Sequence, residues 1–250
     1  MRYWISLINL SAKEWGFNGR LAHLSFWGSI LGSIFFVAIR LHKDTFRFLL
    51  MEDGPVEWLQ AICFGGTAIF AIGVAIWAAR TKRHDQLVLF LLLAAAMIFV
   101  TGEEISWGQR IFGWETPTEL AEINKQNETT LHNIGEVLSV VNIGMMIVGA
   151  VGSVAYLLNK RLRLERYWQE LNYFLIPPFF LAAPFFIVFV YKFVRLAFFP
   201  ESTFTLTKYS EWVELCFAYS MLIFTYVNYR RLSRAALNQR QVSIPTTETF

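Results

Sequence analysis

The apolar residues of this chain are gathered into long runs in which almost every position is hydrophobic. The six runs cover residues 21–41, 55–79, 87 to at least 101, 134–158, 172–193 and 211–229. An α-helix needs roughly 20 apolar residues to cross the hydrocarbon core of a membrane. The pattern therefore predicts an all-α fold: a polytopic membrane helix bundle with about six transmembrane helices, over residues 21–232.

The two ends of the chain differ from these runs. Within residues 1–20, Trp4, Ile8 and Trp15 recur at helical spacing, and basic residues lie nearby. This predicts an N-terminal amphipathic helix lying on the membrane surface, with an unstructured tail as the alternative. Residues 233–250 are mostly polar, so we expect a polar C-terminal tail.

The composition agrees with a surface that faces lipid. Of the 250 residues, 55% are hydrophobic and only 16% are charged, whereas roughly a quarter of a soluble domain is charged. The mean hydropathy is +0.42. The net charge of +3 is small, and the basic residues cluster beside apolar runs, which suits contact with anionic lipid. We therefore expect membrane lipids as partners and no nucleic acid.

Basic residues flank alternate ends of the apolar runs. They form three clusters, namely Arg80, Lys82 and Arg83; Lys160, Arg161, Arg163 and Arg166; and Arg230, Arg231, Arg234 and Arg240. With six spans, these clusters and the N-terminal segment fall on one side of the membrane. The positive-inside rule makes that side cytoplasmic, so both termini are expected in the cytoplasm.

Two predicted spans carry residues that alter helix geometry or packing. Pro177, Pro178 and Pro184 fall in the fifth span, and each removes a helical hydrogen bond, so this helix should be kinked or locally opened. Small residues in the fourth span permit close helix packing, either within the bundle or against a partner, namely Gly144, Gly149, Gly152 and Ser153.

Carboxylate side chains gather where the spans meet the outer side. Glu57 lies at the start of the second span, and Glu211 and Glu214 lie at the start of the sixth. An acid in the first turn of a helix is stabilised by the helix dipole. An ordinary helix start therefore accounts for these three acids without a functional site.

Glu103 and Glu104 need another explanation. They lie at the C-terminal end of the third span, where the dipole disfavours negative charge, about 25 Å along the helix from residue 87. Ionisable residues at that depth usually face the bundle interior and mark a site. In the alternative interpretation Arg110, on the same helical face, neutralises Glu103, but Glu104 is still without a partner.

These carboxylates, with one histidine, have the donor types of a divalent-metal site. Hard carboxylate oxygens and an imidazole together favour zinc, manganese or iron over calcium. The expected metal ligands are His132, Glu104, Asp53 and Glu214, although their spacing matches no established zinc motif. His132 lies in the longest outer loop, residues 113–133, where Thr116 to Glu119 form a capping box that predicts a short helix over 117–125.

The same acids can transfer protons with or without a metal. Glu104, Glu57 and Glu103 are the expected catalytic residues, because a carboxyl between apolar walls can donate or accept a proton. Glu214 is a further candidate if no metal is bound. Ser106 has no base beside it in the sequence, which disfavours a serine nucleophile.

Several motifs resemble those of a family of uncharacterised bacterial polytopic membrane proteins. They are Glu52-Asp53-Gly54 with Glu57-Trp58, the sequence GEEISWGQR at 102–110, and the stretch from Asn124 to His132-Asn133. The resemblance covers about residues 52–133. It implies a location in a bacterial inner membrane and implies no particular activity.

A looser similarity is to the alkaline ceramidase group of membrane hydrolases. Those proteins carry acidic and Trp residues before an early helix, to which Glu52, Asp53, Glu57 and Trp58 are similar. Their zinc site uses three histidines with a serine and an aspartate. This chain has four histidines in all, and His23 and His84 fall on the cytoplasmic side. A ceramidase-type zinc site is therefore not expected.

Three functions are compatible with the sequence. The first is a membrane-embedded hydrolase or transferase that acts on a lipid or lipid-linked substrate at the outer face. Such an enzyme uses either a divalent metal or the carboxyl groups alone. The second is a structural or regulatory subunit, whose acids form a cluster of ion pairs that holds the helices together or binds other membrane proteins. The third is a cation- or proton-coupled transporter, against which stand the almost purely apolar middles of the spans.

Overall fold

Every regular element in the described part of the chain is a helix. The computed structural model describes residues 1–51, 54–117, 130, 135–163, 172–199 and 203–242. Five of their helices are long and apolar enough to cross a membrane, namely α2 (Gly19–Ala38), α4 (Pro55–Arg80), α5 (His84–Glu104), α8 (Gly135–Leu162) and α10 (Ala182–Phe198). The all-α prediction is confirmed, and the chain is an integral membrane protein.

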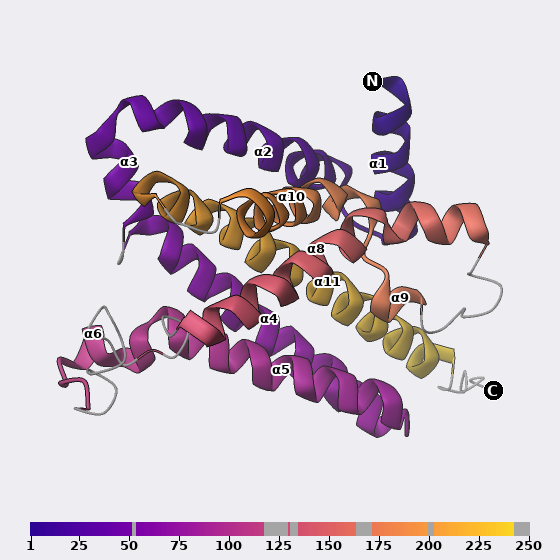
Figure 1. The fold of residues 1–250 in the computed structure, drawn as a ribbon. Coiled ribbons are helices and arrows are strands. Elements are labelled where there is room, and N and C mark those ends of the chain that lie inside the picture. The colour runs from indigo at the N-terminus through magenta and orange to yellow at the C-terminus, as the bar shows by residue number, and fades with distance from the viewer. Residues whose placement is uncertain (52–53, 118–129, 131–134, 164–171, 200–202, 243–250) are drawn as a thin grey trace, which may run out of the picture.

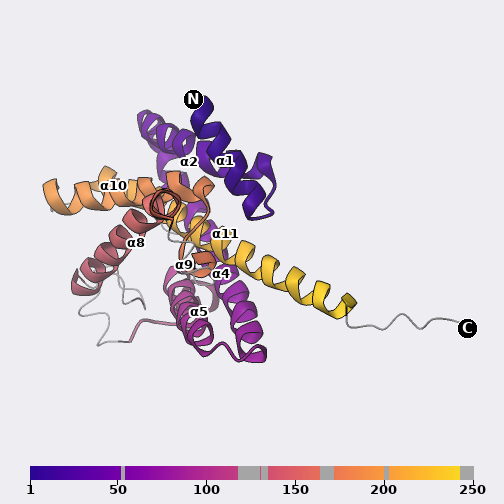
Figure 2. The ribbon, with the colours of Figure 1, turned by 90° about the vertical axis from the view of Figure 1, so that its right-hand side faces the viewer.

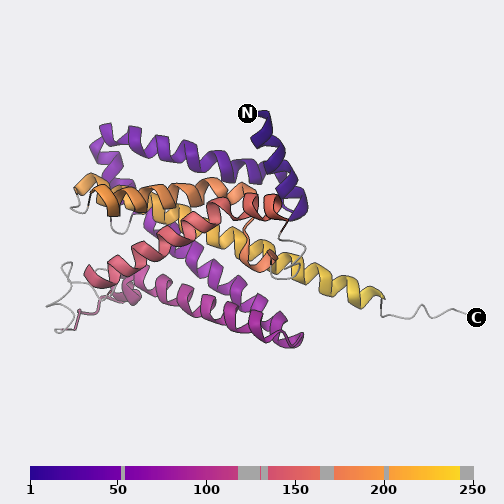
Figure 3. The same ribbon diagram turned by 45° about the vertical axis from the view of Figure 1, so that its right-hand side comes forward.

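Consecutive spanning helices alternate in direction. As a result α3 (Lys43–Leu50) and α6 (Gln109–Phe112) lie at one end of the bundle, together with the start of α11 (Phe204–Val242). The N-terminus and the C-terminal end of α11 at Val242 both lie towards the opposite end (Figures 1 and 3). This arrangement agrees with an even number of crossings, while the side of the membrane on which the termini lie stays a prediction.

The last helix, α11, occupies the middle of the bundle. It packs against α4, α10 and α2, and from 208 to 228 none of its side chains is exposed. Figure 2 shows its C-terminal part extending away from the other helices. Because protein rather than lipid surrounds this stretch, α11 carries more polar residues than the five spans listed above.

The buried polar side chains of α11 bond within their own helix. The Ser220 hydroxyl donates to the Cys216 carbonyl at 2.7 Å, and the Asn228 amide donates to the Phe224 carbonyl at 3.0 Å. The outer helices instead present apolar side chains to the surroundings, such as Leu92, which is 66% exposed. The sixth predicted span, 211–229, lies wholly within α11.

Helix α1 (Arg2–Glu14) is an ordered part of the bundle. Ile8, Ser11 and Ala12 are buried on one face of it. The Ser11 hydroxyl accepts a hydrogen bond from the Phe179 backbone N–H at 2.8 Å, and Glu14 pairs with Lys160 at 2.9 Å. The predicted N-terminal helix is therefore present, and it is tied to the start of the fifth crossing as well as to α8.

The fifth crossing is shorter at its start than the sequence predicts. The short helix α9 (Asn172–Leu175) ends before Pro177 and Pro178, and the chain resumes at η4 (Phe179–Leu181), which leads into α10. A proline lacks an N–H and disfavours a helical conformation in the preceding residue. The apolar crossing is therefore Phe179–Phe198 rather than 172–193. Pro184 lies in the first turn of α10 and does not break it.

Two glycines of α8 lie directly against α10. A Cβ on Gly149 would lie 2.8 Å from the Phe189 nitrogen and 2.9 Å from the Phe185 carbonyl oxygen, and one on Gly152 would meet the Phe185 ring at 2.6 Å. Gly144 has no such neighbour within 4 Å. The predicted close packing of the fourth span within the bundle is confirmed at Gly149 and Gly152, whereas packing of Gly144 against a partner stays a prediction.

Replacing Gly149 by alanine is expected to lower the free energy of unfolding by about 1–3 kcal/mol, because backbone atoms of α10 must move. Gly144→Ala is the matched control and should leave stability unchanged or raise it slightly, since alanine favours helix. Thermal unfolding of both variants in the same detergent measures the difference. Equal melting temperatures for the two would contradict the close contact.

Candidate functional site

Five carboxyl side chains from three helices come together at the end of the bundle that holds α3 and α6. We call them the acidic cluster. They are Glu57 of α4, Glu103 and Glu104 of α5, and Glu211 and Glu214 of α11. The Glu104 carboxyl lies within electrostatic range of the other four. The structure thus brings together acids that are up to 157 positions apart in the sequence (214 minus 57).

The helix dipole explains only one of these acids. Glu57 lies in the first turn of α4, after Pro55 at the first helical position. The expectation that Glu211 and Glu214 also stand at a helix start is wrong, because α11 begins at Phe204. Both lie about two turns or more inside that helix, where the dipole gives little stabilisation.

Glu103 is held by a left-handed turn that follows α5. Its side chain is only 3% exposed and accepts a hydrogen bond from the Trp107 indole N–H at 2.7 Å. The turn η2 (Ser106–Gly108) places Ser106, Trp107 and Gly108 at φ values of 47°, 53° and 82°. Such values are costly for Ser and Trp, and strain of this kind gathers at functional sites. The turn folds the Trp107 ring back over Gly102 and so sets the indole against Glu103.

Glu104 differs from its neighbours. It is half-buried and forms no hydrogen bond or ion pair with another residue that the structure describes, whereas the four surrounding carboxyls all repel its charge. The alternative pairing of Glu103 with Arg110 concerns an Arg110 side chain outside the described residues. Glu104 is therefore the member of the acidic cluster that is available to a proton or a cation.

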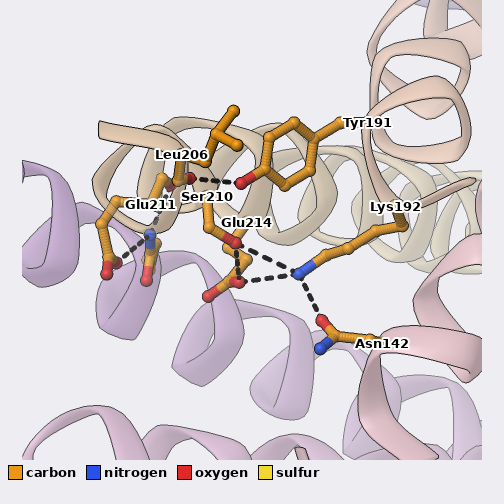
Figure 4. A network of polar contacts seen from close by, with 8 residues as sticks. Asn142, Tyr191, Lys192, Leu206, Ser210, Glu211 and Glu214 are labelled. Atoms are coloured by element: carbon orange, nitrogen blue, oxygen red, sulfur yellow. Dashed lines mark hydrogen bonds and ion pairs between the residues drawn. The ribbon is translucent and has the colours of Figure 1, made fainter. Parts of the chain in front are cut away.

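A buried lysine next to the acidic cluster was not predicted from the sequence. Lys192 of α10 is 3% exposed, and its ammonium group donates to Asn142 Oδ1 at 2.6 Å, Glu214 Oε1 at 2.9 Å and Ser210 Oγ at 3.2 Å (Figure 4). Ser210 also donates to Glu214 Oε1 at 2.6 Å. An ammonium group has three donors, so all three are used. The signal that could have found it is a lysine inside an otherwise apolar stretch of the fifth span.

Gln60 leaves a polar atom unsatisfied beside Glu211. Its amide nitrogen donates to the Glu211 carbonyl oxygen at 2.6 Å and approaches the Glu211 carboxylate at 3.3 Å. Gln60 is fully buried, and its Oε1 atom has no hydrogen-bond partner. Buried polar atoms are rarely left in this state unless a ligand, an ion or water completes the site.

No family model, curated protein or solved structure matches this chain. The resemblance carried by the motifs at 52–58 and 102–110 is therefore still a prediction. The geometry of the acidic cluster is the feature of the molecule that points to a function.

The predicted metal site is only partly within the described residues. Glu104 and Glu214 belong to the acidic cluster, but Asp53 and His132 lie outside the described residues, as does most of the helix predicted over 117–125. Among the residues that are described, no group of three or more His, Cys, Asp or Glu side chains could hold a metal ion. A metal bound by Glu104 and Glu214 would therefore need further ligands, for which Asp53 and His132 are the candidates.

Proposed function

We propose that this integral membrane protein is a hydrolase or transferase that acts on a lipid or lipid-linked substrate at the acidic cluster. The observation that carries the proposal is the position of Glu104, half-buried, unpaired among the described residues and within electrostatic range of four other carboxyls. Glu57 and Glu103 flank it as supporting acids. The termini are proposed to lie in the cytoplasm and the protein in an inner membrane.

The chemistry follows from charge. A carboxylate close to other carboxylates and away from bulk water is stabilised when it shares a proton or a cation. A shared proton allows Glu104 to act as general acid or base. A divalent zinc, manganese or iron ion, bound with the help of Asp53 and His132, would instead polarise the bond to be cleaved. With either a shared proton or a bound metal, the proposed reaction takes place at the end of the bundle that holds α3 and α6.

A second candidate function is cation- or proton-coupled transport. It is favoured by the Lys192–Glu214 ion pair, because Lys192 lies about 9 Å inside α10, counted from Phe198. Charged residues at such depth often take part in ion or proton pathways. The near absence of other charges in the described middles of the spans ranks this candidate second.

Three measurements on the purified protein test the proposal: metal content, lipid turnover and proton uptake into vesicles. Elemental analysis gives the content of zinc, manganese and iron. Mass spectrometry of vesicles made of phosphatidylethanolamine and phosphatidylglycerol follows new lipid products after the protein is added. We expect lipid product to accumulate. Proton uptake without product would favour the transporter, and neither product nor uptake would overturn both functions and leave a structural subunit.

A further inference from the structure

An apolar cavity lies between α2, α10 and the start of α11. Its volume is about 360 Å³, and its walls include Ser33, Phe186, Val190, Val194, Leu206 and Tyr209. This volume is at the lower end of the roughly 300–1,000 Å³ typical of small-molecule sites. The walls are almost entirely hydrocarbon, so the interior suits an apolar chain and offers little to a polar ligand.

Two wall residues of the cavity are exposed on the apolar surface of the fifth crossing. Phe186 is 54% exposed and Val190 38% exposed, and both belong to the apolar crossing. In a membrane this side of the cavity would be in contact with acyl chains. An acyl chain can therefore enter from the bilayer without passing through water.

One cation lines the cavity at the end nearer the acidic cluster. Arg195 lies in the last turn of α10 and reaches the Tyr191 hydroxyl oxygen. That hydroxyl in turn donates to the Leu206 carbonyl. No carboxylate pairs with Arg195 among the described residues. A guanidinium has five N–H donors, so most of them are available to an anion.

We propose that this cavity binds one acyl chain of an anionic phospholipid, whose phosphate is held by Arg195. A phospholipid has an apolar acyl chain that leads to a phosphate at the membrane boundary. The cavity matches both parts, because its walls are apolar and Arg195 lies at one end of it. Arginine forms strong, paired hydrogen bonds with phosphate. The site is distinct from the acidic cluster, and the proposal holds whether or not that cluster is catalytic.

Native mass spectrometry of the full-length protein tests the site. Wild type is released from detergent in the presence of equal amounts of phosphatidylglycerol and phosphatidylcholine with the same acyl chains. We expect one phosphatidylglycerol to be retained in preference to phosphatidylcholine. Arg195→Gln should lower that retention about tenfold or more, because a charge-assisted hydrogen bond is lost.

A second variant tests the cavity itself. Val194→Trp places a larger side chain in the cavity and should abolish retention of the lipid, with Val194→Phe as a milder version if the first does not fold. Matched controls are Arg40→Gln, an exposed arginine next to the C-terminal end of α2, and Val151→Trp, on an exposed face of α8. Both controls should retain phosphatidylglycerol as wild type does.

Two results would overturn the proposal. If the protein retains the two lipids equally and Arg195→Gln does not change this, Arg195 does not bind the phosphate of the anionic lipid. Retention that survives Val194→Trp and Val194→Phe in folded protein means that the lipid lies elsewhere.

Discussion

Replacing Glu104 by glutamine is expected to lower lipid turnover by about 100-fold or more, the usual effect of removing a general acid or base. Glutamine keeps the size and the polarity of the side chain but can neither transfer a proton nor bind a metal strongly. The substitution also removes repulsion from four carboxyls. The free energy of unfolding should therefore stay the same or rise while activity falls.

This combination separates a functional acid from a structural one. Glu115→Gln is the matched control, because Glu115 is an exposed acid shortly after α6, and it should keep wild-type activity. Product formation and thermal unfolding are measured on the same preparations. If Glu104→Gln kept full activity, or if it lost activity only together with stability, the proposed role of Glu104 would be wrong.

Replacing Lys192 by methionine is expected to destabilise the protein by about 1–3 kcal/mol, because the partners of the buried ammonium group lose their donor while Glu214 itself is 27% exposed. The substitution removes the partner of Glu214 and leaves the Asn142 side-chain oxygen without its donor. The double variant Lys192→Met with Glu214→Gln should recover much of this loss, because no unpaired charge is left.

An exposed pair of similar geometry provides the control. Lys160 meets Glu14 at 2.9 Å, the same distance as Lys192 meets Glu214, but the Lys160 side chain is 36% exposed rather than 3%. Lys160→Met should cost at most about 1 kcal/mol, as expected for a surface ion pair. Unfolding in mixed micelles of increasing denaturing detergent compares the four proteins. Equal losses from the two single variants would show that burial does not set the strength of the Lys192 network.

The apolar runs were sufficient to predict most of the fold. The second span, predicted over 55–79, corresponds to α4 (Pro55–Arg80), because about 25 apolar residues after a Gly-Pro start allow few alternatives. The fifth span was misplaced, because hydropathy alone does not tell an apolar helix from the apolar residues around Pro177 and Pro178. The start of α11 was missed for the opposite reason, since its first two turns are too polar to resemble a span.

The candidate site was predicted in part. The depth of Glu104 in the third span was readable from its distance along one helix. The contacts of Lys192 with Asn142 and of Gln60 with Glu211 join residues 50 and 151 positions apart. Such pairs depend on which helices become neighbours, and that information is not local in the sequence. The same holds for the cavity beside Arg195, whose walls come from three helices.

The enclosed position of α11 has a consequence for how the protein is made. A segment with this many polar side chains partitions poorly into lipid by itself, and it leaves the ribosome after α4 and α10, which precede it in the chain. Its insertion therefore depends on α4 and α10 being already present in the bilayer to receive it. Truncated chains that lack α4 should leave α11 outside the membrane, where its C-terminal half would be open to proteolysis.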